Sequence, residues 1–172
     1  AKQGMVPVVA VYSTFLQRAY DMILQDICML NQHVVLAVDR AGLVGEDGET
    51  HHGIYDVGFL RHAPGLKLLA PASCKELQQM LTWAVEEQKG PVAIRYPRGG
   101  DRGYADSAWQ DKAASPVVCH RKGGNVVILT YGVLINNTMA AAEMLSQKGI
   151  EATVLRLMSL APLQIEKIAE QL

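Results

Sequence analysis

The sequence has few cysteines, no long apolar run and no marked excess of charge of either sign. Its three cysteines, Cys28, Cys74 and Cys119, lie far apart without a CxxC pair, which predicts reduced, mostly buried thiols in a cytosolic protein. No apolar stretch approaches the roughly 20 residues that span a bilayer, and no secretory signal is visible. The net charge of −1 gives no electrostatic reason to bind nucleic acid or an anionic membrane.

Several common catalytic motifs are also missing. The sequence contains no P-loop, GxGxxG, GxSxG or HExxH pattern, so nucleoside-triphosphate and serine-hydrolase functions have little support. What it does contain is typical of a globular protein with a real core: 172 residues, 49% of them hydrophobic and 19% charged. That length suits one domain, or one and part of another.

Strand-like and helix-like segments alternate along the first part of the chain. Apolar strands are expected at 6–12, 34–38, 66–70 and 92–96. Helical patterns follow the first and third of these strands, and each opens at capping-box spacing, with Thr14 and Gln17 in one and Ser73 and Glu76 in the other. This order predicts an α/β fold in which helices flank a buried parallel sheet. We expect this domain to cover residues 1–97.

The remainder of the chain predicts a linker and an incomplete second α/β domain. Residues 98–119 are polar and lack periodicity over most of their length, with a short strand expected at 117–120. Residues 120–172 then contain two strand patterns, 125–131 and 151–157, a helix between them and a last helix starting at Pro162. The chain begins at Ala1 without a methionine. We therefore expect a piece of a longer protein, with exposed apolar faces that favour self-association.

The loop at residues 39–53, DRAGLVGEDGETHHG, is the most informative segment. It follows a predicted buried strand, and ligands bind at the carboxyl ends of such strands in open α/β sheets. His51 and His52 are candidates for acid–base chemistry because imidazole titrates near neutral pH, although a structural role stays open for each. No third ligand stands at a recognised spacing for a metal, and Asp47 is expected as a hydrogen-bond partner.

Two arginines and a phenylalanine lie near the same predicted sheet edge. Arg18 falls in the first turns of a helix that begins there, and Arg98 follows a strand. Together with the helix N-terminus they predict a phosphate or carboxylate site, with ion pairing to local acids as the alternative for each. Phe15 could stack on a flat heterocycle or serve ordinary packing.

Three motifs together resemble the 1-deoxy-D-xylulose-5-phosphate synthase family. They are YSTFLQRAYD at 12–21, DRAGLVG with DGETHHG inside 39–53, and RYPRG at 95–99. The first and third motifs distinguish this family from transketolases and from β subunits of 2-oxo acid dehydrogenases, whereas transketolases share a GEDGxTH run. The resemblance covers nearly the whole chain and implies the pyrimidine-binding fold of thiamine enzymes, followed by the start of their C-terminal domain.

The resemblance also implies a reaction and residue roles. The family is a homodimeric transferase of bacterial cytoplasm or plastids that makes 1-deoxyxylulose 5-phosphate from pyruvate and glyceraldehyde 3-phosphate. It uses thiamine diphosphate and magnesium, and it feeds isoprenoid and thiamine biosynthesis. Carried over to this sequence, Phe15 would stack on the cofactor's aminopyrimidine, and His51 would be catalytic and assist pyruvate addition. The substrate-binding residues would be Tyr12, Arg18, Asp47 and Arg98.

Two family motifs have no counterpart in this chain. The Glu-Gln-His motif with the catalytic glutamate would precede the segment equivalent to Val6, and the Gly-Asp-Gly to Asn motif that holds magnesium and diphosphate belongs to an N-terminal domain. The resemblance therefore implies that no metal ligand lies here and that this chain alone is inactive. Two alternatives stay open: a subunit of a split transketolase-like enzyme, and a non-catalytic structural or regulatory domain.

Overall fold

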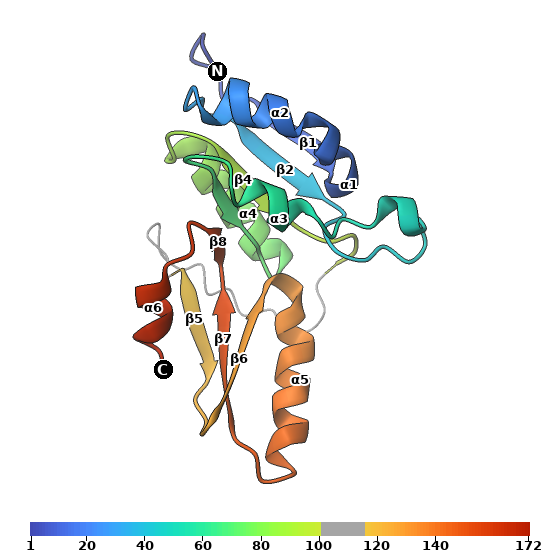
Figure 1. Ribbon diagram of the computed structural model, residues 1–172, viewed down its shortest axis with the longest axis vertical. Coiled ribbons are helices and arrows are strands. Elements are labelled where there is room, and N and C mark those ends of the chain that lie inside the picture. Colours follow the sequence, from blue (N-terminus) through green and yellow to red (C-terminus); the bar gives the residue numbers. More distant parts are fainter. Residues whose placement is uncertain (101–115) are drawn as a thin grey trace.

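The computed structural model describes residues 1–100 and 116–172, whose strands form two sheets (Figure 1). The first sheet has the strand order β1–β2–β4–β3–β8, and the second has the order β5–β7–β6. The predicted linker at 98–119 falls largely on residues 101–115, which lie outside the described part of the chain.

Four parallel strands make up most of the first sheet, as the alternating pattern predicted. They are β1 (Val8–Tyr12), β2 (Val35–Asp39), β3 (Lys67–Leu69) and β4 (Val92–Arg95). Continuous apolar sequences bury β2 and β4 on both faces. Strand β1 differs, because it is the edge strand of this sheet in the described chain, and Val8 and Val9 remain 51% and 42% exposed.

The segment after β1 is an interrupted helix. Its parts are α1 (Ser13–Leu16), a 3-10 turn (Gln17–Ala19), α2 (Tyr20–Met22) and a π-helical segment (Ile23–Cys28). The expected capping by Thr14 is wrong: Tyr12 is the N-cap residue, and the Thr14 hydroxyl instead donates to the carbonyl oxygen of Thr50 at 3.0 Å. A long-range hydrogen bond thus replaces the local one that spacing alone suggested.

The second capping pattern gives the helix it predicted. Helix α4 (Cys74–Glu86) has Ser73 as its N-cap, and the Ser73 hydroxyl accepts a hydrogen bond from the Glu76 backbone N–H at 3.2 Å. A shorter helix, α3 (Asp56–Leu60), was not expected from the sequence. Its first residue, Asp56, is buried and accepts a hydrogen bond from Arg95 Nε at 2.7 Å.

The second sheet and its helices follow the predicted order. Its elements are β5 (Val117–Arg121), β6 (Val126–Tyr131), α5 (Ile135–Ser146), β7 (Ala152–Leu157) and α6 (Ile165–Ala169). Strand β7 pairs in parallel with β6 and antiparallel with β5. Helix α6 begins after Gln164 rather than at Pro162.

A short strand that the sequence did not indicate joins the two halves. Strand β8 (Ser159–Ala161) follows β7 directly but pairs antiparallel with β3 of the first sheet. Its Leu160 and Ala161 enter the apolar core that also contains Leu36 and Leu68. The second half of the chain therefore extends the sheet and core of the first half.

A fully buried ion pair ties the two halves together beside that strand. The guanidinium of Arg156, on β7, donates to both carboxylate oxygens of Glu76, on α4, at 2.7 and 2.8 Å, and both side chains are 0% exposed. Glu76 also accepts from the Ala72 N–H at 2.8 Å, and Arg156 Nε donates to His120 Nε2 at 3.1 Å. These hydrogen bonds satisfy charges that burial would otherwise strongly destabilise.

Apolar side chains lie exposed on two edge strands, one in each sheet. In addition to β1, strand β6 exposes Val126, Val127 and Leu129 by 37, 44 and 51%. The self-association that we expect from such faces stays a prediction. Within residues 1–100 and 116–172, no helix has the length and apolar character needed to cross a membrane.

Candidate functional site

The carboxyl ends of three neighbouring strands meet at one edge of the first sheet. Tyr12, the last residue of β1, lies opposite Asp39 at the end of β2, and Val38 lies opposite Arg95 at the end of β4. The loop after β2 then runs beside α1 (Figure 1). The predicted convergence of polar segments on this edge is confirmed.

Two backbone hydrogen bonds close the loop at its base. The Gly42 N–H donates to the Gly53 carbonyl at 2.7 Å, and the Gly53 N–H donates to the Gly42 carbonyl at 2.8 Å. A Cβ atom on Gly53 would lie 2.4 Å from the Arg40 carbonyl oxygen and 2.5 Å from Ser13 Cβ. Only glycine allows this close approach between the loop and α1. We name the closed segment 42–53 the histidine loop.

Three rings form a cluster between α1 and the histidine loop. Tyr12 and Phe15 stack with ring centroids 5.5 Å apart and an interplanar angle of 15°. The imidazole of His51 meets Phe15 edge-on at 5.4 Å and Tyr12 at 6.4 Å. Phe15 remains 48% exposed, so this aromatic surface is open to a ligand.

The two histidines of the loop have different surroundings. His52 Nδ1 accepts a hydrogen bond from the Val44 N–H at 3.0 Å, which fixes the fold of the loop. His51 ends the 3-10 turn Glu49–His51, and its Nδ1 lies 3.0 Å from Thr50 Oγ1. His52 therefore has the structural role that stayed open in the sequence, while His51 faces the ring cluster.

Charged groups lie beside the rings, with Asp47 at their centre. Arg98 donates to Asp47 Oδ1 at 3.1 Å and pairs with Glu46 at 2.8 Å. Arg40 Nε lies 3.0 Å from Asp47 Oδ2, in ionic contact without the alignment of a hydrogen bond, and its guanidinium sits 4.2 Å above the Tyr12 ring. Asp47 thus links the two arginines through a hydrogen bond from Arg98 and an ionic contact with Arg40.

Arg40 contacts both Asp47 and the Tyr12 ring, although it was not among the predicted site residues. Its backbone φ of +54° is rare for a residue with a side chain, and such conformations concentrate at functional sites. The signal available in the sequence was its position directly after the strand that ends at Asp39, in the same run as His51.

The structure connects five of the six site residues and leaves one apart. Tyr12, Phe15, Asp47, His51 and Arg98 are joined through ring contacts and through Arg40. Tyr12 contributes ring contacts with Phe15, His51 and Arg40. Arg18 is exposed on the turn Gln17–Ala19, and within the described residues no ion pair or ring contact connects it to the others.

Tyr96 lies at the same sheet edge, directly after β4. Burial raises the pKa of its phenol, and the negative charge of Asp39 raises it further. The hydroxyl is therefore held in its neutral form well above neutral pH. Among the residues that the structure describes, no group of three or more His, Cys, Asp or Glu side chains lies close enough together to hold a metal ion.

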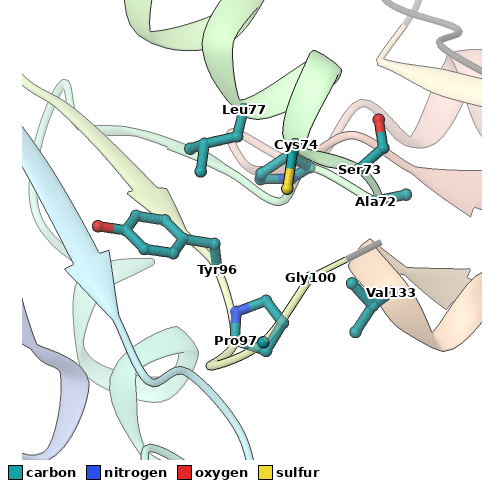
Figure 2. Close-up of a pocket in the computed structure, with 10 residues that line it drawn as sticks. Ala72, Ser73, Cys74, Leu77, Tyr96, Pro97, Gly100 and Val133 are labelled. Carbon is teal, nitrogen blue, oxygen red and sulfur yellow. The ribbon is translucent and has the colours of Figure 1, made fainter. Parts of the chain in front are cut away.

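Tyr96 and Pro97 also line a pocket that does not include the ring cluster (Figure 2). The start of α4, with Cys74 and Leu77, forms one wall, and Gly100 and Val133 lie opposite. Figure 2 shows the sulfur of Cys74 facing the segment of Pro97. None of the six site residues belongs to its lining, so the pocket and the ring cluster are separate features.

The site combines an aromatic surface, an imidazole and two arginines at the ends of parallel strands. Comparison of the whole chain with known protein families identifies where such a fold occurs. The family model described as "Transketolase, pyrimidine binding domain" matches residues 1–101. This chain belongs to that family. The model described as "Transketolase, C-terminal domain" matches residues 116–172. The α/β fold with a pyrimidine-binding domain followed by part of a second domain is thereby confirmed.

Relatives of this transketolase-family chain include cyanobacterial enzymes. It is 45% identical over 170 residues to 1-deoxy-D-xylulose-5-phosphate synthase from Rippkaea orientalis and 43% identical to that from Microcystis aeruginosa. Each match covers 98% of this chain but only 27% of the relative. The resemblance inferred from the three motifs is confirmed, and the chain spans about a quarter of the length of these relatives.

Solved structures give the same fold. A split-gene transketolase, described as an inactive β4 tetramer, matches with a TM-score of 0.82 and 26% identity over 99% of this chain and 55% of its own. A transketolase from Pichia stipitis matches with the same TM-score over 96% of this chain and 25% of its own. At 18% identity the second likeness supports the fold alone.

Proposed function

We propose that this chain is part of a 1-deoxy-D-xylulose-5-phosphate synthase, a transferase that decarboxylates pyruvate and joins the two-carbon unit to glyceraldehyde 3-phosphate. The observation that carries the proposal is the cluster of Tyr12, Phe15 and His51 beside the Asp47-linked arginines. It combines a surface for a flat ring, a group that can move protons and a cationic surface for a phosphate. The sequence identity over nearly all of the chain supports the same assignment.

The residues present suit the aminopyrimidine end of thiamine diphosphate. Phe15 offers a half-exposed ring, backed by the stacked ring of Tyr12, and aromatic rings favour offset stacking on flat heterocycles. When bound, the cofactor would supply the carbanion chemistry of the reaction, and the protein would supply orientation and electrostatics. The diphosphate and magnesium ligands, in this proposal, belong to the N-terminal domain of the parent protein.

The side chains of the site divide the remaining tasks. His51, at the edge of the aromatic surface, would exchange a proton with the substrate carbonyl oxygen. Arg98 would exchange its exposed partner Glu46 for the phosphate of glyceraldehyde 3-phosphate, a bidentate ligand of higher charge. Arg40 and Asp47 would hold the position of Arg98 and of the Tyr12 ring, and Arg18 would add positive charge from α1.

The arrangement of the parent protein is part of the proposal. Residues 1–97 would form the pyrimidine-binding domain, 98–119 a linker and 120–172 the first part of the C-terminal domain. The exposed apolar strands β1 and β6 would be covered in a cytoplasmic homodimer of the parent chain. This chain by itself would be inactive, because it lacks the counterpart of the family's catalytic glutamate.

The test uses the full-length parent with pyruvate, glyceraldehyde 3-phosphate, thiamine diphosphate and magnesium. His51→Ala should lower kcat by about 100-fold or more, the usual contribution of a positioned acid–base group. Arg98→Ala should raise KM for glyceraldehyde 3-phosphate by roughly 10- to 100-fold, the equivalent of one charged hydrogen bond. His62→Ala and Arg61→Ala, exposed positions after α3, are the matched controls. Unchanged kinetics in both site variants would refute the assignment.

A second candidate function is a subunit of a split transketolase-like enzyme. The likeness to the split-gene transketolase, over 99% of this chain, favours it specifically. Mixing this chain with a separately produced N-terminal domain discriminates the two. Restored activity with pyruvate supports the synthase, whereas activity with a ketose phosphate and an aldose acceptor, but none with pyruvate, supports the alternative.

A further inference from the structure

Thr50, next to His51 in the histidine loop, is held on two sides. Its backbone carbonyl accepts a hydrogen bond from the Thr14 hydroxyl of α1 at 3.0 Å. Its own Oγ1 lies 3.0 Å from Nδ1 of the His51 ring. The peptide of Thr50 is thus tied to the element that carries Phe15, while its side chain is in contact with the imidazole.

The two groups can pair in either direction. A neutral imidazole has one N–H and one bare nitrogen, and a hydroxyl can donate one hydrogen bond and accept two. Among the described residues, Thr50 Oγ1 has no hydrogen-bond partner other than His51 Nδ1, so donation to this nitrogen is the pairing that uses the hydroxyl proton within the chain. We propose that Thr50 is a positioning residue that donates to Nδ1 and holds neutral His51 in the tautomer with its proton on Nε2.

The neighbouring histidine provides an internal reference. His52 Nδ1 accepts from the backbone N–H of Val44, which can only donate. Neutral His52 must therefore also carry its proton on Nε2. The two histidines differ in that a backbone group fixes one tautomer, whereas a side chain that can be replaced fixes the other.

The hydroxyl can also follow a change in the protonation of His51. If the ring takes up a second proton, Nδ1 becomes a donor, and the Thr50 oxygen can accept by rotation of its O–H. The titratable Tyr12 phenol belongs to a ring whose centroid lies 6.4 Å from that of His51, and Glu49 and His52 lie within two residues of His51 in the histidine loop. Together with the edge contact to Phe15, Thr50 keeps Nε2 available for a substrate in both protonation states.

The direct test is ¹⁵N NMR of the imidazoles in the 172-residue chain, at a pH where His51 is neutral. In the wild type we expect His51 to resemble His52, with a protonated Nε2 and a bare Nδ1. Thr50→Val removes the donor but keeps the shape, and should shift the His51 tautomer ratio roughly threefold to tenfold toward Nδ1–H, the equivalent of one neutral hydrogen bond. Thr50→Ser should restore the wild-type ratio.

The controls separate a change in tautomer from a change in fold. Thr138→Val removes a hydroxyl on α5, far along the chain from the loop, and should leave both histidines unchanged. His52 should also keep its signals in Thr50→Val, which shows that the histidine loop is intact. A His51 ratio that is unaltered by Thr50→Val, or a wild-type ring protonated at Nδ1, would overturn the proposal.

The meaning of this tautomer for catalysis rests on the proposed function. In the full-length enzyme, Thr50→Val should lower kcat by the same factor as the Nε2–H fraction measured by NMR and leave KM for glyceraldehyde 3-phosphate near the wild-type value, and Thr50→Ser should recover kcat. A shifted tautomer with unchanged kcat would mean that His51 does not act as proposed, while the hydrogen bond from Thr50 stands. An unshifted tautomer refutes the Thr50 proposal whatever the activity.

Discussion

Two of the arginine–carboxylate pairs in this molecule lie in opposite environments. At the joint between the sheets, Arg156 and Glu76 are 0% exposed and make two aligned hydrogen bonds. Beside the histidine loop, Arg98 is 42% exposed and pairs with Glu46 of that loop, which is 83% exposed. The same two chemical groups are present in both places, so the difference lies in the access of water.

The contrast explains which pair supports the fold and which suits a ligand. A buried charge that loses its partner is strongly destabilised because no water replaces that partner. An exposed pair gains little from its contact, since water and salt screen both charges. Arg98 can therefore exchange partners easily, whereas Arg156 cannot. Four predictions compare buried with exposed positions, from the largest expected effect to the smallest.

Glu76→Gln should disrupt the buried ion pair that connects the two halves of the fold. It leaves the guanidinium of Arg156 buried without a countercharge, so the free energy of unfolding should fall by about 3–5 kcal/mol. Urea unfolding followed by circular dichroism measures the loss. The double variant Glu76→Leu with Arg156→Met is the control and should be more stable than Glu76→Gln, because neither charge remains. A loss below about 1 kcal/mol would show that water reaches the Arg156–Glu76 ion pair.

Gly53→Ala should distort the base of the histidine loop. The new methyl group would lie within 2.6 Å of atoms of Arg40 and Ser13, and overpacking of this kind lowers stability by about 1–3 kcal/mol. Gly45→Ala, in the same loop with open space around its Cβ position, is the matched control. Equal unfolding midpoints for the two variants would contradict the close approach.

The buried thiol of Cys28 should make the stability of the fold depend on pH. Burial raises the pKa of its thiol from 9.0 to about 11, so the folded state keeps a proton that the unfolded state releases above pH 9. The contribution of this thiol to the free energy of unfolding is fully present below pH 9. It should decline by about 1 kcal/mol per pH unit between pH 9 and 11. Urea unfolding at pH 8, 9 and 10 measures the slope. Cys28→Ala should remove this component, and an unchanged slope in that variant would refute it.

Arg98→Ala should leave stability nearly unchanged. Its ion pairs are exposed, and such pairs contribute about 1 kcal/mol or less. The same urea experiment applies, and 0.5 M sodium chloride, which screens exposed charges, should reduce any difference further. A loss as large as that of Glu76→Gln would mean that Arg98 has a structural role, and the comparison between the two regions would fail.

Much of the first sheet could be read from local sequence. The apolar runs that became β2 and β4 and the Ser73–Glu76 cap of α4 depend on residues close together in the chain. The candidate site residues were predicted from the same local signal, since all of them lie at or after the end of a strand, and their roles stay predictions. Arg40 was missed because its importance comes from the contact of its guanidinium with Tyr12, which a linear pattern does not contain.

The errors share one cause, which is long-range contact. Thr14 was expected to cap a helix locally but donates to Thr50, 36 positions away. Strand β8 is only three residues long and too short for a periodic signal, yet it pairs with β3. Glu76 was recognised as a capping residue, while its bidentate partner lies 80 positions further along.

The sequence by itself determined the α/β class, the positions along the chain of most strands and the loop that holds His51, because hydrophobic periodicity and turn residues act over short distances. Only the tertiary structure decided which arginine is buried and which is exposed, and which of two adjacent histidines faces the aromatic rings. Those outcomes depend on the atoms that surround each group. Such atoms come from segments that lie far apart in the chain and meet only when both sheets are formed.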